Sequence, residues 1–288
     1  MEIRTVGVVG AGTMGQGIAQ VFAQAGFDVR LVDVEASMLD RARIAMSRSL
    51  GKFVEKGKST AVDRDQTLAR ISMSTSIDHL AEADYLIEAI IEDVEAKRAL
   101  FRTLDRVGKT EAIIASNTSS ISITTLASAT ARADRVLGMH FMNPVPLMPL
   151  VELVRGESTS PASLATAHEL CDRLDKTAVD AADFPGFISN RILMPMINEA
   201  IYAVMEGVGT PEAIDTVLTL GMNHPMGPLT LADFIGLDVC LAIMQVLHEG
   251  FGDSKYRPCP LLRRMVAAGR LGRKSGQGFY SYQPQRSQ

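Results

Sequence analysis

The polypeptide has little cysteine, no tryptophan and no excess of positive charge. Its three cysteines (Cys171, Cys240 and Cys259) are scattered, with neither metal-ligand spacing nor the even number that a disulfide framework requires. Lysine and arginine total 29 against 33 for aspartate and glutamate, and the formal net charge of −4 argues against general nucleic-acid binding. No uninterrupted apolar run approaches the roughly 18 residues of a membrane span. These absences predict a reduced, cytoplasmic protein with no metal, nucleic-acid or membrane partner.

What is present is an ordinary globular composition, with 47% hydrophobic and 22% charged residues, in a chain of 288 residues that is long enough for two domains. The first predicted strand begins within a few residues of Met1, which leaves no room for a signal or transit peptide. A matrix protein whose transit peptide had been removed would have the same composition, so that alternative stays open.

The most informative segment is a glycine-rich turn between a strand-like run, 6–9, and a helical pattern. In this G-x-G-x-x-G motif, Gly10 suits the tight turn, Gly12 lets a pyrophosphate approach the backbone, and Gly15 allows close packing of helix on strand. The pyrophosphate would rest on the N-terminus of the helix. Asp33 ends the next predicted strand, where a carboxylate accepts from a ribose 2′-OH and repels a 2′-phosphate. The motif therefore predicts NAD rather than NADP, and the alternative is a glycine turn that binds no ligand.

Residues 3–183 alternate between strand-like and helix-like patterns, which predicts an α/β domain with a parallel sheet covered on both faces. Between the second and third strands, residues 35–70 form a helix pair too long for a simple crossover, and we expect it to project as an arm. The predicted strands are Val6–Val9, Val29–Val32, Ile71–Thr75, Tyr85–Ala89, Ala112–Ala115, Val136–Met139 and Leu150–Val154.

Strand patterns largely vanish beyond Asp183, which predicts a Rossmann-like domain over 1–184 and an all-α domain over 185–288. The helices expected at 187–205 and 229–248 are apolar over most of their surface. Because a domain of roughly 100 residues cannot bury so much apolar helix in its own core, we expect part of it in a subunit interface, and hence a homodimer.

Three groups of polar residues do not fit the surrounding pattern. The segment 116–120 (S-N-T-S-S) follows a buried strand at the edge where ligands bind, although helix capping would also explain it. His140 ends a strand at the same edge, and Glu152 lies in an apolar run where an unpaired carboxylate would be costly. A strand–loop–strand return would pair the two, while a satisfied core histidine is the alternative. Asn190 lies on an apolar helix face, where an interhelix hydrogen bond would also account for it.

The arm carries a local cluster of basic residues in an otherwise acidic protein. Such a cluster suits a phosphorylated ligand, but on composition alone a solvated helix face explains it as well. The residues are Arg48, Lys52, Lys56 and Lys58.

Taken together, these segments resemble the short-chain L-3-hydroxyacyl-CoA dehydrogenase family, and within it the bacterial 3-hydroxybutyryl-CoA members. The resemblance covers the whole chain, in an ordered set of motifs: G-A-G-T-M-G at 10–15, E-A-I-I-E at 88–92, S-N-T-S-S at 116–120, H-F-M-N-P-V-P at 140–146, L-V-E at 150–152, D-F-P-G-F-I-S-N-R at 183–191 and G-R-K-S-G-Q-G-F-Y at 272–280.

The resemblance implies NAD-dependent interconversion of (S)-3-hydroxyacyl-CoA and 3-oxoacyl-CoA, with short chains such as 3-hydroxybutyryl-CoA and acetoacetyl-CoA as substrates. It implies that His140 is the acid/base, that Glu152 orients it, and that Ser119 and Asn190 hydrogen-bond the reacting oxygen. It assigns CoA contacts to Ser49 and Lys56, with Ser119 near the thioester, and dimerisation to the C-terminal domain. The implied NAD contacts are Gly10, Gly12, Thr13, Met14, Gly15, Asp33, Glu92, Lys97, Asn143 and Lys274.

One departure from the family pattern is Pro149, where members commonly have lysine. The change removes a positive charge near Glu152, so we expect it to alter either substrate preference or the basicity of His140, with the assigned catalytic residues intact. Two other functions remain as alternatives: a dehydrogenase of a free hydroxy acid such as L-gulonate, and a non-catalytic NAD-binding structural protein.

Overall fold

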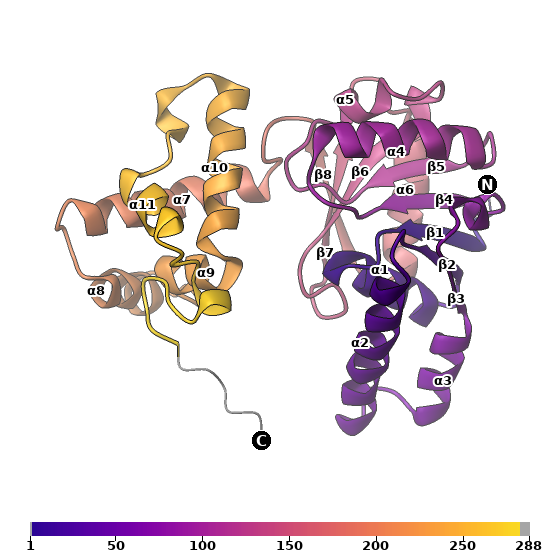
Figure 1. Cartoon of the computed structure of the whole chain (residues 1–288), viewed down its shortest axis with the longest axis horizontal. Coiled ribbons are helices and arrows are strands. Elements are labelled where there is room, and N and C mark those ends of the chain that lie inside the picture. The colour runs from indigo at the N-terminus through magenta and orange to yellow at the C-terminus, as the bar shows by residue number, and fades with distance from the viewer. Residues whose placement is uncertain (1, 283–288) are drawn as a thin grey trace. The chain divides into compact units, whose positions relative to one another are not determined.

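The chain divides into two compact units, Met1–Phe184 and Pro185–Gln288, of which the computed structural model describes residues 2–282 (Figure 1).

The first unit is built on a mixed β-sheet, which has eight strands within the described residues, in the order β3-β2-β1-β4-β5-β6-β7-β8. Neighbouring strands pair in parallel except β6 and β7, which are antiparallel. The strand order reverses between β1 and β4, and in open sheets of this type ligands bind outside the carboxyl ends of the strands at that switch point. The strands are β1 Thr5–Val9, β2 Asp28–Val32, β3 Ile71–Ser74, β4 Tyr85–Glu88, β5 Ile113–Ser116, β6 Val136–Phe141, β7 Leu150–Arg155 and β8 Thr177–Ala182.

The predicted α/β class and all seven predicted strands are confirmed, with two corrections to the sheet. The β6–β7 pair is antiparallel because only residues 142–149 join the two strands, and a parallel crossover needs a dozen or more residues. The edge strand β8 was missed, since most of its residues are exposed and it lacks a buried apolar run.

Helices flank the sheet, with α4 and α5 drawn above the strands and α1, α2 and α3 below them in Figure 1. A hydrophobic core joins sheet residues to apolar side chains of α1, α2 and α6. The helices are α1 Thr13–Gln24, α2 Ala36–Glu55, α3 Ala61–Ala69, α4 Val94–Val107, α5 Ile123–Ala127 and α6 Pro161–Arg173, with short 3₁₀ turns at Ile77–Leu80 and Ala133–Arg135.

The predicted arm is present as the antiparallel pair α2 and α3, which pack on each other and extend from the sheet (Figure 1). Buried residues at helical spacing along α2 (Leu39, Ala42, Met46 and Leu50) hold it in place. Helix α3 starts at a capping box in which the side chains of Thr60 and Asp63 each accept a hydrogen bond from the other residue's backbone N–H.

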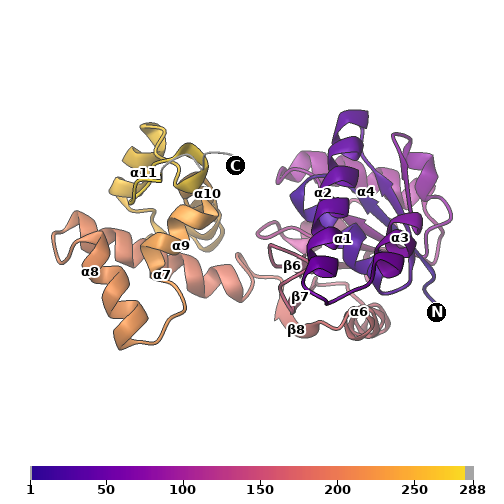
Figure 2. The same cartoon turned by 90° about the horizontal axis from the view of Figure 1, so that it is seen from below.

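The second unit is all-helical over the residues described (Figure 2), and its core is formed mainly by α7, α9, α10 and α11. Pro211 occupies the first turn of α8, as its fixed φ favours. The helices are α7 Ser189–Met205, α8 Pro211–Thr216, α9 Pro228–Ile235, α10 Leu237–Phe251 and α11 Pro260–Ala267, with a short π-helix at Val217–Gly221 and short 3₁₀ helices at Ser254–Tyr256 and Arg273–Ser275.

The single helix predicted over 229–248 is wrong. Gly236 has φ of +105°, so the helix breaks there into α9 and α10, which are bent by 98°. Within the described residues, no single helix is both long and apolar enough to cross a membrane, and only this bent pair taken together reaches the required length and composition.

Candidate active site

The glycine-rich turn between β1 and α1 has the geometry that a dinucleotide requires. A Cβ on Gly10, whose φ is +98°, would lie 2.5 Å from the Ala89 carbonyl oxygen, and one on Gly15 would lie 1.7 Å from that of Gly10. Both positions therefore need glycine for the turn and for packing. At Gly12 a Cβ would meet nothing within 4 Å, which leaves open space at the N-terminus of α1. Free N–H groups and open space at a helix N-terminus fit the pyrophosphate of NAD.

Asp33 lies directly beyond β2 and its carboxylate is fixed against the glycine turn. Oδ2 accepts a hydrogen bond from the Ala11 N–H at 2.7 Å, and Oδ1 accepts from the Glu35 N–H at 3.0 Å. The half-buried acid thus stands beside the turn, in the position from which a ribose hydroxyl can be bound.

His140 and Glu152 form a cross-strand pair on β6 and β7. The antiparallel register places them directly opposite each other, and His140 Nδ1 lies 2.8 Å from Glu152 Oε2. Glu152 is 2% exposed and His140 is 8% exposed. The contact predicted from the strand–loop–strand pattern is present, but β6 continues through Phe141, so His140 is the penultimate residue of the strand rather than its last.

The loop 116–120 is bonded to the strand that carries His140 through Asn117, to which sequence analysis gave no role of its own within that loop. Asn117 Oδ1 accepts from the Phe141 N–H at 3.0 Å, and the Asn117 N–H donates to the carbonyl of Glu88. Asn117, which directly follows β5, therefore bonds to the end of β4 through its backbone and to the end of β6, next to His140, through its side chain. Its place directly after a buried strand was the available signal.

Glu92 and Lys97 are joined by an ion pair, with 3.3 Å between Nζ and Oε2. Glu92 Oε1 also accepts from the Thr118 hydroxyl at 2.6 Å and from the N–H of the half-buried Ser119 at 2.9 Å. Burial raises the pKa of Glu92, but the charge of Lys97 and these hydrogen bonds outweigh it and leave the pKa below its usual value. Glu92, of the predicted cofactor set, thus contacts Ser119, of the predicted substrate set, while Lys97 reaches Ser119 only through Glu92.

The basic arm and the loop after β6 line one cavity of about 290 Å³. The predicted substrate residues Ser49, on α2, and Lys56, in the turn after it, both line this cavity. Pro144 and Pro146 line it from the loop after β6. The remaining lining residues are Ala45, Arg48, Lys52, Phe53, Lys58 and Leu147. Four cations around an open cavity favour the phosphorylated-ligand interpretation over a solvated helix face.

Two predicted site residues lie in the second unit. Asn190 is buried in the first turn of α7, three residues after Phe187, which has a positive φ of 51°. Lys274 is exposed and forms an ion pair with Asp238, in the first turn of α10, with 2.5 Å between Nζ and Oδ1. Asn143 lies exposed in the loop after β6.

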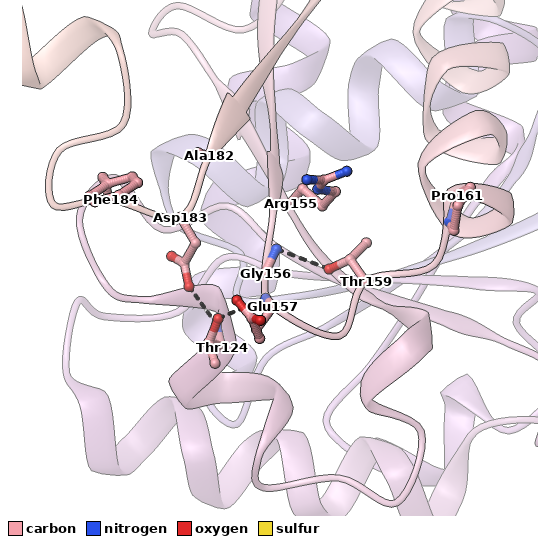
Figure 3. A pocket seen from close by; sticks show the side chains of 9 residues that line it. All are labelled: Thr124, Arg155, Gly156, Glu157, Thr159, Pro161, Ala182, Asp183 and Phe184. Carbon is pink, nitrogen blue, oxygen red and sulfur yellow. Dashed lines mark hydrogen bonds between the residues drawn. The ribbon is translucent and has the colours of Figure 1, made fainter.

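A further cavity, of about 470 Å³, lies beside the end of β7 and contains none of the predicted site residues (Figure 3). Its polar groups bond to one another: the Asp183 carboxylate accepts from the Thr124 N–H, and the Gly156 N–H donates to the Thr159 hydroxyl. The side chain of Arg155 points away from Asp183 in Figure 3. The arrangement caps α5 with the last residues of the first unit. Across residues 2–282, no group of three or more potential metal ligands comes together.

A Rossmann-like sheet with a glycine turn, a ribose-binding acid and a buried histidine–glutamate pair at the carboxyl edge defines an NAD-dependent dehydrogenase. Comparison with known families specifies which one. Family models described as the NAD binding domain and the C-terminal domain of 3-hydroxyacyl-CoA dehydrogenase match residues 5–184 and 186–282. The chain belongs to the 3-hydroxyacyl-CoA dehydrogenase family, as its motifs predicted.

Individual relatives agree with the family models. The chain is 59% identical over 277 residues to a probable 3-hydroxybutyryl-CoA dehydrogenase of Deinococcus radiodurans, covering 96% of this chain and 99% of the relative. It is 55% identical to a probable 3-hydroxybutyryl-CoA dehydrogenase of Bacillus subtilis over the full length of both. The crystal structure of (S)-3-hydroxybutyryl-CoA dehydrogenase from Ralstonia eutropha matches with a TM-score of 0.96 and 50% identity, covering 98% of this chain and all of that one.

Proposed function

We propose that this dehydrogenase interconverts short-chain (S)-3-hydroxyacyl-CoA and 3-oxoacyl-CoA, with 3-hydroxybutyryl-CoA and acetoacetyl-CoA as the preferred pair. The observation that carries the proposal is the buried His140–Glu152 pair at the carboxyl edge of the NAD-binding unit. The names of the bacterial relatives support the short chain length.

In the proposed mechanism, His140 moves the proton of the substrate's 3-hydroxyl group. Glu152 engages Nδ1, so Nε2 is the ring nitrogen that takes the proton during oxidation and returns it during reduction. Glu152 stabilises the imidazolium formed in between and holds the ring in one orientation. NAD, when bound, supplies the acceptor or donor of the hydride.

Two polar side chains are proposed to stabilise the charge that develops on the reacting oxygen. Ser119 follows the carboxyl end of β5 and has its N–H held by Glu92. Asn190, in the second unit, is proposed as the other donor on the strength of the motif around it. A preorganised donor of this kind typically contributes about 10²–10³-fold to turnover.

The proposed cofactor contacts divide between the pyrophosphate, the ribose and the nicotinamide half. Open space over Gly12 and the carboxylate of Asp33 support the first two. We propose that Glu92, Lys97 and Asn143 serve the nicotinamide half, because the second half of a dinucleotide extends beyond β1 toward β4 and β5. Lys274, in the second unit, is proposed for the same half on the strength of the motif at 272–280 alone. The residues proposed for the turn are Gly10, Gly12, Thr13, Met14 and Gly15.

For the CoA portion, we propose that the arm cavity takes the phosphorylated end, with Ser49 and Lys56 as the first contacts. Arg48, Lys52 and Lys58 line the same cavity and add positive charge that a free hydroxy acid would not need. This observation favours a thioester of CoA over a free acid such as L-gulonate.

We propose a homodimer formed through the second unit and located in the cytoplasm. Large apolar side chains exposed there, including Leu220 at 83% and Val208 at 77%, support the dimer. The three cysteines are unpaired and buried, and burial raises the pKa of Cys171 to about 12, so this thiol is unreactive and compatible with a reducing compartment.

The deciding experiment is NADH oxidation with acetoacetyl-CoA, measured beside longer 3-oxoacyl-CoAs, free acetoacetate and NADPH. The proposal expects turnover with NADH and thioesters only, fastest with acetoacetyl-CoA. Turnover of free acetoacetate at the thioester rate would overturn the assignment of the CoA portion, and fastest turnover of a longer thioester would overturn the chain length.

A further inference from the structure

Glu88 is a fully buried carboxylate that the mechanism above does not use. It is the last residue of β4, at the carboxyl edge of the sheet, and its side chain is 0% exposed. Oε1 accepts from the Ile90 N–H at 2.7 Å and from Lys97 Nζ at 2.5 Å. Oε2 accepts from the Ser116 hydroxyl at 2.6 Å. Because both oxygens of this buried carboxylate accept hydrogen bonds, the side chain is held in one orientation and in turn fixes the positions of its partners.

Through Lys97, Glu88 is connected to the residues proposed to bind the cofactor. Lys97 is 1% exposed, and its ammonium lies between the carboxylates of Glu88 and Glu92. Glu92 then receives the N–H and hydroxyl of Ser119 and the hydroxyl of Ser120. A continuous chain of charge-assisted hydrogen bonds therefore runs from Glu88 to the loop that carries Ser119.

Through Ser116, Glu88 is connected a second time to the loop 116–120. Ser116 is the last residue of β5 and stands directly opposite Glu88 in the parallel register. Its hydroxyl donates to Glu88 and accepts from the Thr118 N–H at 3.1 Å. The loop 116–120 is thus anchored to one carboxylate from both ends, through Ser116 and through Lys97 and Glu92.

We propose that Glu88 is a positioning residue for the reaction, which sets the place of Lys97 for the nicotinamide half of NAD and the place of Ser119 for the substrate. An ion pair buried in this way stabilises a fold no better than apolar residues of the same volume. Its partners, however, are the groups proposed to bind cofactor and substrate. The substrate part of this inference rests on the proposed function, whereas the cofactor part depends only on NAD binding.

The test uses two substitutions that separate the two routes. Glu88→Gln keeps the shape and an acceptor for Ile90 but removes the charge that holds Lys97. We expect the Kd for NADH to rise about tenfold, the effect of weakening one hydrogen bond to a charged group. Ser116→Ala breaks only the second route, so we expect a several-fold rise in the KM for acetoacetyl-CoA with the Kd for NADH near that of the unchanged protein.

NADH binding is measured by fluorescence titration, KM by NADH oxidation and folding by thermal unfolding. The matched control is Glu95→Gln on α4, an exposed acid whose partner is Arg98, which we expect to leave Kd and KM unchanged. A Glu88→Gln protein that is less stable but has the original Kd and KM would overturn the proposal. If Glu88→Gln does not fold, a rise in KM for Ser116→Ala supports the positioning role and an unchanged KM overturns it.

The two hypotheses fail in different ways. Absence of turnover with acetoacetyl-CoA in the unchanged protein would refute the proposed substrate, while the NADH titrations would still decide whether Glu88 positions the cofactor residues.

Discussion

At the scale of single residues, the pairing of His140 with Glu152 depends on strand register. The two are directly opposite across β6 and β7, so their side chains emerge on the same face. A slip of one residue in either strand would move one of them to the other face of the sheet. The pair therefore needs the fixed length of the 142–149 connection as well as the two residues.

The role of His140 gives the most direct prediction. In His140→Gln the side chain can no longer exchange a proton, so we expect turnover to fall by at least about 10²–10⁴-fold, the usual contribution of a positioned acid/base. The Kd for NADH should stay within a few-fold, as fluorescence titration would show. His168→Gln is the matched control, since His168 is 40% exposed and pairs with Asp180. Loss of NADH binding together with turnover would mean that His140 is structural.

A second residue-scale prediction concerns pH. Because the pKa of Glu92 is lowered in the folded protein, its ionised form stabilises the fold at neutral pH, and this contribution is lost as pH falls below the ordinary value of 4.5. Glu92→Gln lacks the charge at every pH. We therefore expect the variant to be less stable than the unchanged protein at pH 7, with the difference shrinking toward pH 3. Urea unfolding across this range measures it, and a difference that stays constant with pH would contradict the assignment.

At the scale of elements, the arm and the loop after β6 form the cation-lined cavity between them. The loop after β6 is fixed by Lys176, a buried lysine that donates to the carbonyls of Val145 and Met148 at 2.8 and 2.7 Å. Burial lowers the pKa of Lys176. Because one ammonium binds two carbonyls of this loop, the loop is held in one conformation, and the residues with which it lines the cavity are fixed in place.

Reversing one charge on the arm tests which ligand the cavity takes. Lys56→Glu places a carboxylate in the cavity, so we expect the KM for acetoacetyl-CoA to rise about tenfold or more while the Kd for NADH is unchanged. Arg43→Glu, on the outer face of the same helix and outside the cavity, should change neither value. Equal effects of the two substitutions would indicate a general electrostatic influence rather than a binding contact.

At the scale of the whole molecule, the chain consists of two units, and the second is the one through which we propose that the chain dimerises. The second unit leaves large apolar side chains exposed along its α7–α8 end, where Met205, Val208, Val217, Leu220 and Met222 are 36% to 83% exposed. A helical unit of this size has no further core in which to bury them, which is the physical reason for proposing a dimer.

Leu220→Glu is expected to weaken that association, because it places a charge within an apolar contact surface. Sedimentation velocity should find the unchanged protein at twice the chain mass of 31.1 kDa and the variant shifted toward the single chain. Val62→Glu, which alters an apolar residue on the arm that is 63% exposed, should remain a dimer. A variant at Leu220 that sediments as the unchanged protein would exclude this surface.

Local sequence determined a large part of this description. The strand–glycine turn–helix pattern, the acid at position 33 and the alternation of strands and helices depend on neighbours in the chain, and they predicted the class and the cofactor correctly. The His140–Glu152 contact was also predictable, since a short connection between two apolar strands allows only an antiparallel return.

Tertiary structure decided what depends on residues distant in sequence. The edge strand β8 forms only because β7 is there to pair with it, and the break at Gly236 follows from a backbone angle that apolar periodicity does not report. The resemblance marked Lys97 as a cofactor contact, but local sequence gives no sign that Lys97 or Lys176 is buried. Their roles arise from carboxylates and carbonyls brought from other elements, because the cost of burying a charge is met only by partners that folding assembles.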